Sequence, residues 1–278
     1  MLPWPTPGGA PLAVRDNGQS QPRHGRPAAS AEGSLSAMTT DSRTRQHSEG
    51  RWHGPVRDWR VVLLTFTAGA VNAVSFLALG KVFSSVITGN MVLLGVAATT
   101  RNSSEAIHGA AALAGYSAGV LAGAPIAARG SDHRGTWPAS VTATLAAELC
   151  VLAAFCVGWE LGGGTPRDGA QLALLVVLAA AMGMQSAAVR RLGQMSSTYL
   201  TSTLTGVLAG LVTRSKPDGL GRSIGVLAAI VAGALAGGLL ATSAHPWLPA
   251  VIMLPPAVVV GESVAAARRA RGRPRRRT

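Results

Sequence analysis

The feature that most constrains this chain is a series of long apolar segments. They cover approximately residues 61–79, 82–98, 107–128, 138–158, 169–189, 197–213, 223–244 and 247–264. A helix needs about 20 apolar residues to cross a bilayer, and six of the eight segments approach or exceed that length. Only 13% of the residues are charged, about half the fraction of a soluble domain. The sequence therefore predicts an all-α polytopic membrane protein.

The segments 82–98 and 197–213 are shorter and more polar than the others, so they are either full spans or broken, re-entrant segments. With a cytoplasmic N-terminus, eight crossings would divide the ten loop cations equally between the two sides. Six crossings would place seven inside (Arg129, Arg134, Arg190, Arg191, Arg214, Lys216 and Arg222) and three outside (Lys81, Arg101 and Arg167). Because cytoplasmic loops are rich in Lys and Arg, we predict six spanning helices plus two short polar segments, in the cell membrane, with both termini cytoplasmic.

The tails differ in composition from the transmembrane domain, which we place at residues 57–267. Residues 1–56 are rich in Pro, Gly, Ser and Arg, and their composition predicts a disordered tail. Met38 begins a plausible shorter chain, so residues 1–37 need not be native. The basic run 268–278 is expected to lie against anionic lipid in the cytoplasm. The net charge of +13 is spread over the tails and loops, so nucleic-acid binding is not expected.

The two halves of the transmembrane domain, 61–158 and 169–264, resemble each other. Asn72 precedes Gly80 by eight residues, as Gln185 precedes Gly193, and a Thr-Gly pair follows in each half. Small residues recur at a four-residue spacing, at Gly115, Gly119 and Gly123 and again at Gly233, Gly237 and Ala241. Such stripes allow close helix packing in lipid. Three spans per half would make the second repeat inverted, a pattern typical of secondary transporters.

Polar residues within the apolar region are the candidates for a substrate pathway. They include Thr88-Gly89 and Thr205-Gly206, because broken backbone in a membrane must face protein or a water-filled cavity. Asn90 could cap a helix that restarts after Thr88-Gly89. Asn72 and Gln185 could clamp a polar ligand or pair with each other. For the Ser and Thr residues of the two Thr-Gly segments, the alternative is that they only bond to helix backbone and hold helices together.

Glu148 lies in the middle of an apolar span. A carboxylate at that depth costs about 3 kcal/mol or more, so this group should be protonated, paired or facing water. It is either an acid that couples protons or contacts substrate, or a neutral, hydrogen-bonded buried residue.

Two stretches resemble the signature of the YoaK family, also called DUF1275. They are GAVNAVSFLALGKVFSSVITGNMVLLG, from Gly69 to Gly95, and AMGMQSAAVRRLGQMSSTYLTSTLTG, from Ala181 to Gly206. The resemblance extends over Arg60 to Ala267 and implies a bacterial multi-span membrane protein, sometimes described as a permease. Family members often have an acidic residue where this chain has Asn72, and an amide there cannot carry a proton. The matching positions are Thr88, Gly89, Asn90, Gln185, Thr205 and Gly206.

These patterns favour a secondary transporter or permease for a small, unidentified solute. The alternatives are a non-transporting membrane scaffold or stress-response protein and, more weakly, a lipid-modifying enzyme centred on Glu148. The chain contains no Walker motif, and an enzyme is not expected. The His and Cys residues show no metal-ligand spacing, and no metal or cofactor is expected.

Overall fold

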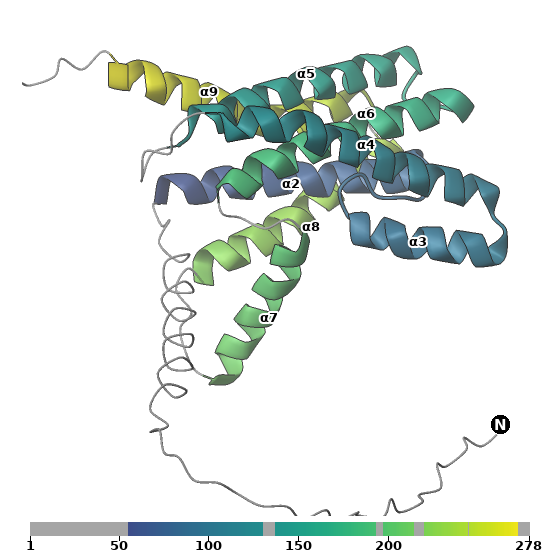
Figure 1. The fold of residues 1–278 in the computed structure, drawn as a ribbon, viewed down its shortest axis with the longest axis horizontal. Helices are drawn as coiled ribbons and strands as arrows, with labels where there is room; N and C mark the ends of the chain where they lie inside the picture. The colour runs from purple at the N-terminus through teal and green to yellow at the C-terminus, as the bar shows by residue number, and fades with distance from the viewer. Residues whose placement is uncertain (1–54, 130–136, 193–196, 214–219, 244, 272–278) are drawn as a thin grey trace, which may run out of the picture. The chain divides into compact units, whose positions relative to one another are not determined.

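The computed structural model describes residues 55–129, 137–192, 197–213, 220–243 and 245–271. These residues form eight α-helices and one 3-10 turn and contain no strand (Figure 1). The helices are α2 (Pro55–Ala78), α3 (Ile87–Thr100), α4 (Ser103–Ala128), α5 (Ala139–Leu161), α6 (Asp168–Arg191), α7 (Ser197–Thr213), α8 (Leu220–Ser243) and α9 (Leu248–Arg271), and the turn is η1 (His245–Trp247). The predicted disordered tail up to residue 54, with Met38, and the basic tail after residue 271 lie outside the described residues.

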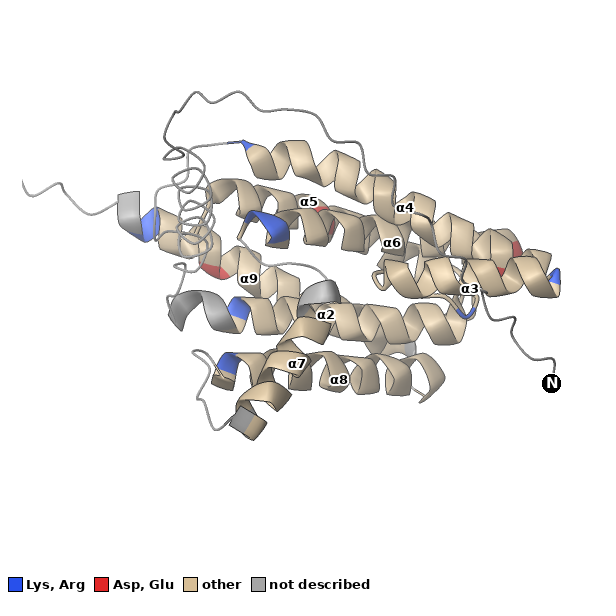
Figure 2. Cartoon of the chain, turned by 60° about the horizontal axis from the view of Figure 1, so that its bottom comes forward, with Lys and Arg blue, Asp and Glu red and all other residues tan. Residues whose placement is uncertain are grey.

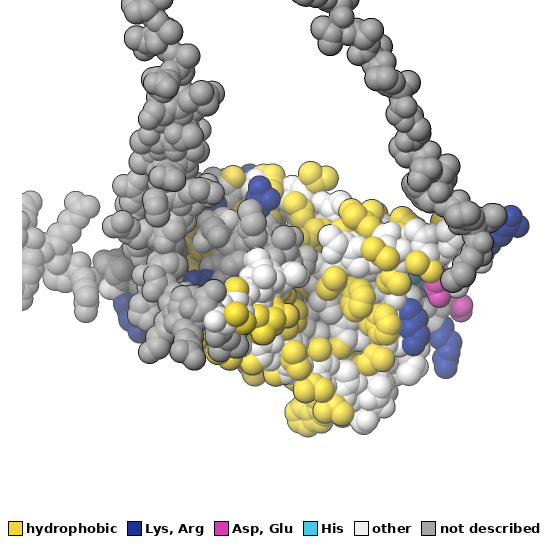
Figure 3. All heavy atoms as spheres, turned by 90° about the horizontal axis from the view of Figure 1, so that it is seen from below, with side chains coloured by type: hydrophobic (Ala, Val, Ile, Leu, Met, Phe, Trp, Pro, Cys, Tyr) yellow, Lys and Arg dark blue, Asp and Glu magenta, His cyan; other side chains and the backbone are white. Residues whose placement is uncertain are grey.

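Six helices are long and apolar enough to cross a membrane: α2, α4, α5, α6, α8 and α9. Helices α3 and α7 are shorter apolar helices, as predicted for the two Thr-Gly segments. The outer surface is also apolar, since Leu121, Leu235 and Leu239 are 75%, 62% and 65% exposed. Hydrophobic side chains are spread across the middle of the face in Figure 3. Apolar groups on both the inside and the outside are the expected pattern for a helix bundle in lipid.

The two repeats interlock. Helix α2 of the first repeat packs most extensively on α8 of the second, and α4 of the first packs equally extensively on α6 of the second. Helices α5 and α9, which end the two repeats, pack on each other, α5 also on α6 and α9 also on α2. Each contact thus recurs with the two repeats exchanged, which is the arrangement expected of the predicted repeats.

The small-residue stripes lie at these helix pairs. A Cβ atom added to Gly119 on α4 would collide with the backbone carbonyl of Ala180 on α6. A Cβ atom on Gly233 of α8 would collide in the same way with the carbonyl of Phe66 on α2. The helix backbones are therefore in direct contact. Such contact is expected in lipid, where no hydrophobic force drives helices together and van der Waals packing contributes to their association. This confirms the predicted role of the stripes.

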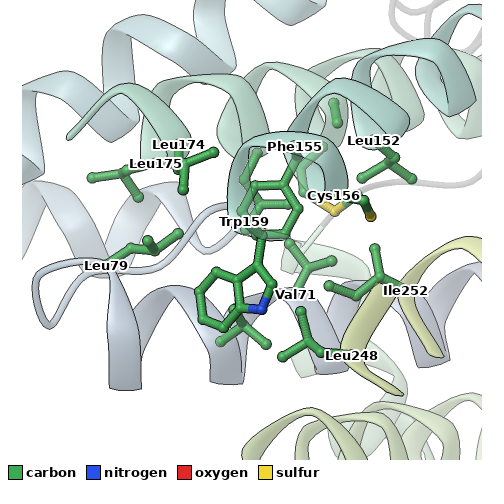
Figure 4. Close-up of a cluster of buried hydrophobic side chains, with 14 of the residues drawn as sticks. Val71, Leu79, Leu152, Phe155, Cys156, Trp159, Leu174, Leu175, Leu248 and Ile252 are labelled. Atoms are coloured by element: carbon green, nitrogen blue, oxygen red, sulfur yellow. The ribbon is translucent and has the colours of Figure 1, made fainter. Parts of the chain in front are cut away.

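Two clusters of buried apolar side chains fill the space between the helices. The large cluster is centred on Phe155 and Trp159 of α5, whose ring centroids are 5.9 Å apart. Figure 4 shows Trp159 beside Val71 and Leu248. The small cluster consists of Leu64, Val141, Leu145, Ala188, Leu192 and Val259. Both clusters draw on α2, α5, α6 and α9, so each helix passes from one cluster to the other.

Charged residues gather at the two ends of the helices, and the helix middles are almost free of them (Figure 2). One end carries the cations at the start of α2 and α8 and at the end of α4, α6 and α9, together with the single acid Glu262 on α9; the cations are Arg60, Arg129, Arg190, Arg191, Arg222, Arg268 and Arg269. The other end carries Lys81, Arg101 and Arg167 together with Glu105, Glu160 and Asp168. One end of the described bundle is therefore strongly basic and the other is nearly neutral.

Candidate functional site

The chain breaks between α2 and α3, and Asn72 holds the broken segment in place. Its Nδ2 donates to the Ser85 hydroxyl at 2.7 Å, and its Oδ1 accepts from the Ser85 backbone N–H at 3.0 Å and from the Ser84 hydroxyl at 3.3 Å. Asn72 precedes the end of α2 at Ala78 by six residues, a distance of about 9 Å along the helix. The segment therefore folds back beside α2, and α3 then runs alongside α4 (Figure 1).

Asn90 has a similar role from the other side of the break. Its Oδ1 accepts from the Phe83 backbone N–H at 2.9 Å, and its Nδ2 donates to the Phe83 carbonyl. The prediction that Asn90 caps the restarted helix is wrong, because α3 already begins at Ile87, with Val86 at the capping position. The amide instead satisfies the N–H and C=O of one non-helical residue, which buried backbone requires.

The alternative roles proposed for Asn72 can now be separated. Asn72 does not pair with Gln185, because the described partners of its side chain are Ser84 and Ser85. Its polar atoms bond to the segment at the break, an arrangement that neither predicted role anticipated. The two repeat-equivalent amides thus have different surroundings.

The Thr-Gly pairs do not join a common site with these amides. Thr88 is exposed and Gly89 half-buried near the start of α3. Thr205 and Gly206 are exposed on α7, and the Thr205 hydroxyl donates to the backbone carbonyl of Thr201 at 3.0 Å. An added Cβ on Gly206 would meet no atom within 4 Å.

Glu148 on α5 and Gln185 on α6 form the candidate site. Glu148 is 0% exposed and Gln185 is 6% exposed. Gln185 is the side chain whose amide interacts with this carboxyl group. However, neither carboxyl oxygen of Glu148 nor Nε2 of Gln185 has a hydrogen-bond partner among the described residues. The two groups face each other without reaching hydrogen-bond geometry.

The pair lies between the two apolar clusters. On α5, Leu145 belongs to the small cluster and Leu152 to the large one, with Glu148 between them. On α6, Gln185 lies between Met182 of the large cluster and Ala188 of the small one. Glu148 is nine residues from the start of α5, about 14 Å along the helix. The site is thus at the depth of hydrocarbon, enclosed from both ends.

Sequence reasoning missed two polar residues that support the fold around the break. The Ser75 hydroxyl accepts from the Ser84 backbone N–H at 3.1 Å and donates to the Asn72 carbonyl at 3.0 Å. Gln171 Nε2 on α6 donates to the carbonyl of Ala78 at the end of α2, at 2.8 Å. The signal for Ser75 is its position three residues after Asn72, which places both on one face of α2. Gln171 has no comparable signal.

Comparisons with known proteins agree with this architecture. The family model described as "Protein of unknown function (DUF1275)" matches residues 61–261. The curated UPF0700 transmembrane protein YoaK of Bacillus subtilis (strain 168) is 32% identical over 160 residues, which are 57% of this chain and 68% of that protein. No solved structure matches the chain. This chain is a multi-pass membrane protein that belongs to the DUF1275 family.

Proposed function

We propose that this protein is a secondary transporter for a small polar solute, and that Glu148 and Gln185 contact that solute. The observation that carries the proposal is a buried acid and a buried amide that face each other with hydrogen-bonding capacity unused. A buried polar group without a partner costs about 1–3 kcal/mol. A solute with donors and acceptors would remove that cost on binding, which favours occupation of the site.

The interlocked repeats support transport for a mechanical reason. Transporters built from inverted repeats expose a site near the membrane midplane to each side in turn, by movement of one repeat against the other. Here the site joins α5 of the first repeat to α6 of the second. A shift between the repeats would therefore change the distance between Glu148 and Gln185.

Of the two amides predicted to contact solute, Asn72 and Gln185, only Gln185 is kept as a contact. Asn72 and Asn90 are hydrogen-bonded to the break between α2 and α3. Thr88, Thr205 and Gly206 are exposed, whereas Glu148 is buried. These five residues are therefore assigned to structure or to the lipid-facing surface.

Charge supports an orientation in the cell membrane. The basic end of the bundle, defined by Arg60, Arg129, Arg190, Arg191, Arg222, Arg268 and Arg269, is placed in the cytoplasm by the positive-inside rule. Both termini are then cytoplasmic. The basic run 268–278 follows in the sequence, and each arginine near an anionic lipid surface would be worth about 1 kcal/mol of attraction.

The groups near Glu148 favour transport of the solute without chemical conversion. A lipid-modifying enzyme would need a nucleophile activated by an adjacent base. The buried hydroxyl nearest along α5, Thr144, donates to the backbone carbonyl of Ser140 at 2.9 Å. Glu148 interacts with an amide, which is neither a nucleophile nor a base.

The test uses purified protein in liposomes. A panel of small solutes is first screened for an increase in thermal stability, and each hit is then measured by radiolabelled counterflow. Wild-type protein should exchange the hit, and Glu148→Gln should lower the rate at least tenfold, since the solute would lose its acidic contact. The matched control is Glu160→Gln, which changes an exposed acid on the same helix and should retain the rate.

Two outcomes would contradict the proposal. Wild-type exchange in Glu148→Gln would remove this residue from the pathway. A folded wild-type protein that binds and exchanges no solute in the panel would favour the scaffold alternative.

A further inference from the structure

We infer that the pair formed by Glu148 and Gln185 is a proton-binding site, in which Glu148 takes up a proton when enclosed and releases it when the pair opens to water. The inference rests on the proposed function, because it names the ion that couples to solute movement. It does not follow from transport alone, since a solute site need not titrate.

The first step is the cost of charge at this position. Glu148 is completely buried between Leu145 of the small cluster and Leu152 of the large cluster. An ionised carboxylate in such surroundings loses its hydration and costs far more than the neutral acid does. Neither of its oxygens has a hydrogen-bond partner among the described residues. The enclosed state therefore favours the neutral, protonated acid.

No charged side chain is named among the influences on Glu148. The helices packed against α5 are α4, α6 and α9, and the influences on Glu148 are its burial and Gln185. The other ionisable groups with described side chains on these helices are Glu105, His108, Tyr116, Asp168, Arg190, Arg191, Glu262, Arg268 and Arg269. The causes named for Glu148 include none of these groups. A proton is then the species that neutralises the acid.

The oxygen atoms at this site are fewer than a metal cation requires. Hard cations are held by six or more oxygen ligands. Glu148 and Gln185 together offer two carboxyl oxygens and one amide oxygen. Within the part of the chain that the structure describes, no three His, Cys, Asp or Glu side chains gather into a metal-binding group. The oxygen count suits a single proton.

The Gln185 amide can stabilise both the protonated and the ionised form of Glu148. When the acid is neutral, its O–H can donate to the Gln185 amide oxygen; when the acid is ionised, the amide N–H can donate to the carboxylate. An amide that turns over thus stabilises both forms, and Nε2 of Gln185 is free for this among the described residues.

The experiment uses dicyclohexylcarbodiimide on the purified, full-length protein in liposomes. This apolar reagent dissolves in hydrocarbon, and the O–H of a protonated carboxyl group adds across one of its C=N bonds. An acyl shift then gives a stable N-acylurea with no leaving group, and mass spectrometry locates it. We expect modification of Glu148 in acidic buffer, at least tenfold less in alkaline buffer, and none at this position in Glu148→Gln.

A second measurement detects the protonated acid in the wild-type protein without chemical modification. Infrared difference spectra of acidic against alkaline samples show the carbonyl absorption of every carboxylic acid that titrates between the two, and Glu148 should contribute one component. That component should be missing in Glu148→Gln and kept in Glu160→Gln. No modification of Glu148 at any pH, together with an unchanged infrared difference in Glu148→Gln, would overturn the inference.

Failure of the inference and failure of the proposed function give different results. Solute exchange that responds neither to the carbodiimide nor to an imposed pH gradient would leave transport intact and remove the proton site. Titration of Glu148 in a protein that exchanges no solute would keep the proton site and remove the transport function.

Discussion

At the residue scale, the same kind of side chain has two different roles in the two repeats. Asn72 makes three hydrogen bonds to the segment that follows α2. Gln185, its repeat equivalent, faces Glu148 with its Nε2 unpaired among the described residues. One amide is thus committed to structure, whereas the other is available for a ligand or a proton.

Asn72 should therefore govern stability rather than transport selectivity. Asn72→Ala leaves the buried Ser84 hydroxyl and the half-buried Ser85 N–H without this acceptor, and an unsatisfied buried group costs about 1–3 kcal/mol. We expect a lower melting temperature. Cys156 is buried, so in a Cys150→Ala background a thiol-reactive dye reports unfolding through it.

Two further variants sharpen this prediction. Asn72→Asp keeps an oxygen acceptor for both serines and should melt nearer to wild type than Asn72→Ala does. Thr88→Ala changes an exposed candidate from the same segment and should shift stability by no more than about 0.5 kcal/mol. Equal melting temperatures for Asn72→Ala and Thr88→Ala would show that the hydrogen bonds to Ser84 and Ser85 do not support the fold.

At the element scale, the fold depends on how closely pairs of helices approach. Helices α2 and α8 touch backbone to backbone at Gly233, as α4 and α6 do at Gly119. In lipid, apolar side chains gain little hydrophobic free energy by packing on one another instead of on lipid tails. Contact area and dispersion therefore contribute strongly to which helices associate. The stripes therefore favour the pairing of α2 with α8 and of α4 with α6, each of which joins one repeat to the other.

Gly233→Ala should separate α8 from α2. The added methyl group would press on the Phe66 carbonyl, and overpacking of this kind costs about 1–3 kcal/mol. Gly225→Ala is the matched control on the same helix, because its Cβ would meet only the Val62 side chain at 3.6 Å. It should be neutral or stabilising by up to about 1 kcal/mol, since alanine favours a helix.

The measurement is the same dye assay, with the two variants compared side by side. A stability loss in Gly225→Ala as large as that in Gly233→Ala would show that any alanine in α8 is harmful. The loss could then not be assigned to the contact with α2.

At the scale of the whole molecule, six spans and a folded-back α3 determine which loops share a side of the membrane. The basic helix ends lie together, and the nearly neutral ends lie opposite (Figure 2). This arrangement follows from α3 running beside α4. Eight crossings would instead distribute the same cations over both sides.

Cysteine labelling should place Arg101 outside and Arg129 inside. These residues flank the two ends of α4, a helix of 26 residues and hence about 39 Å long. Single cysteines at the two positions, in a background without Cys150 and Cys156, are treated in intact cells with a membrane-impermeant maleimide. We expect labelling at position 101 alone, and labelling at position 129 only after the cells are opened. The reverse pattern would establish eight spans.

The sequence by itself determined the membrane class, the number of long spans, the repeat, the small-residue stripes and the unusual position of Glu148. These properties depend on composition and spacing within single segments, where hydrocarbon imposes simple limits on length and charge. Only the tertiary structure decided that Asn72 bonds to Ser84 and Ser85, that α3 begins before Asn90, and that Gln185 faces Glu148. Such pairings depend on the rotation of each helix about its axis and on the contacts between helices distant in sequence, and no spacing within one segment specifies either.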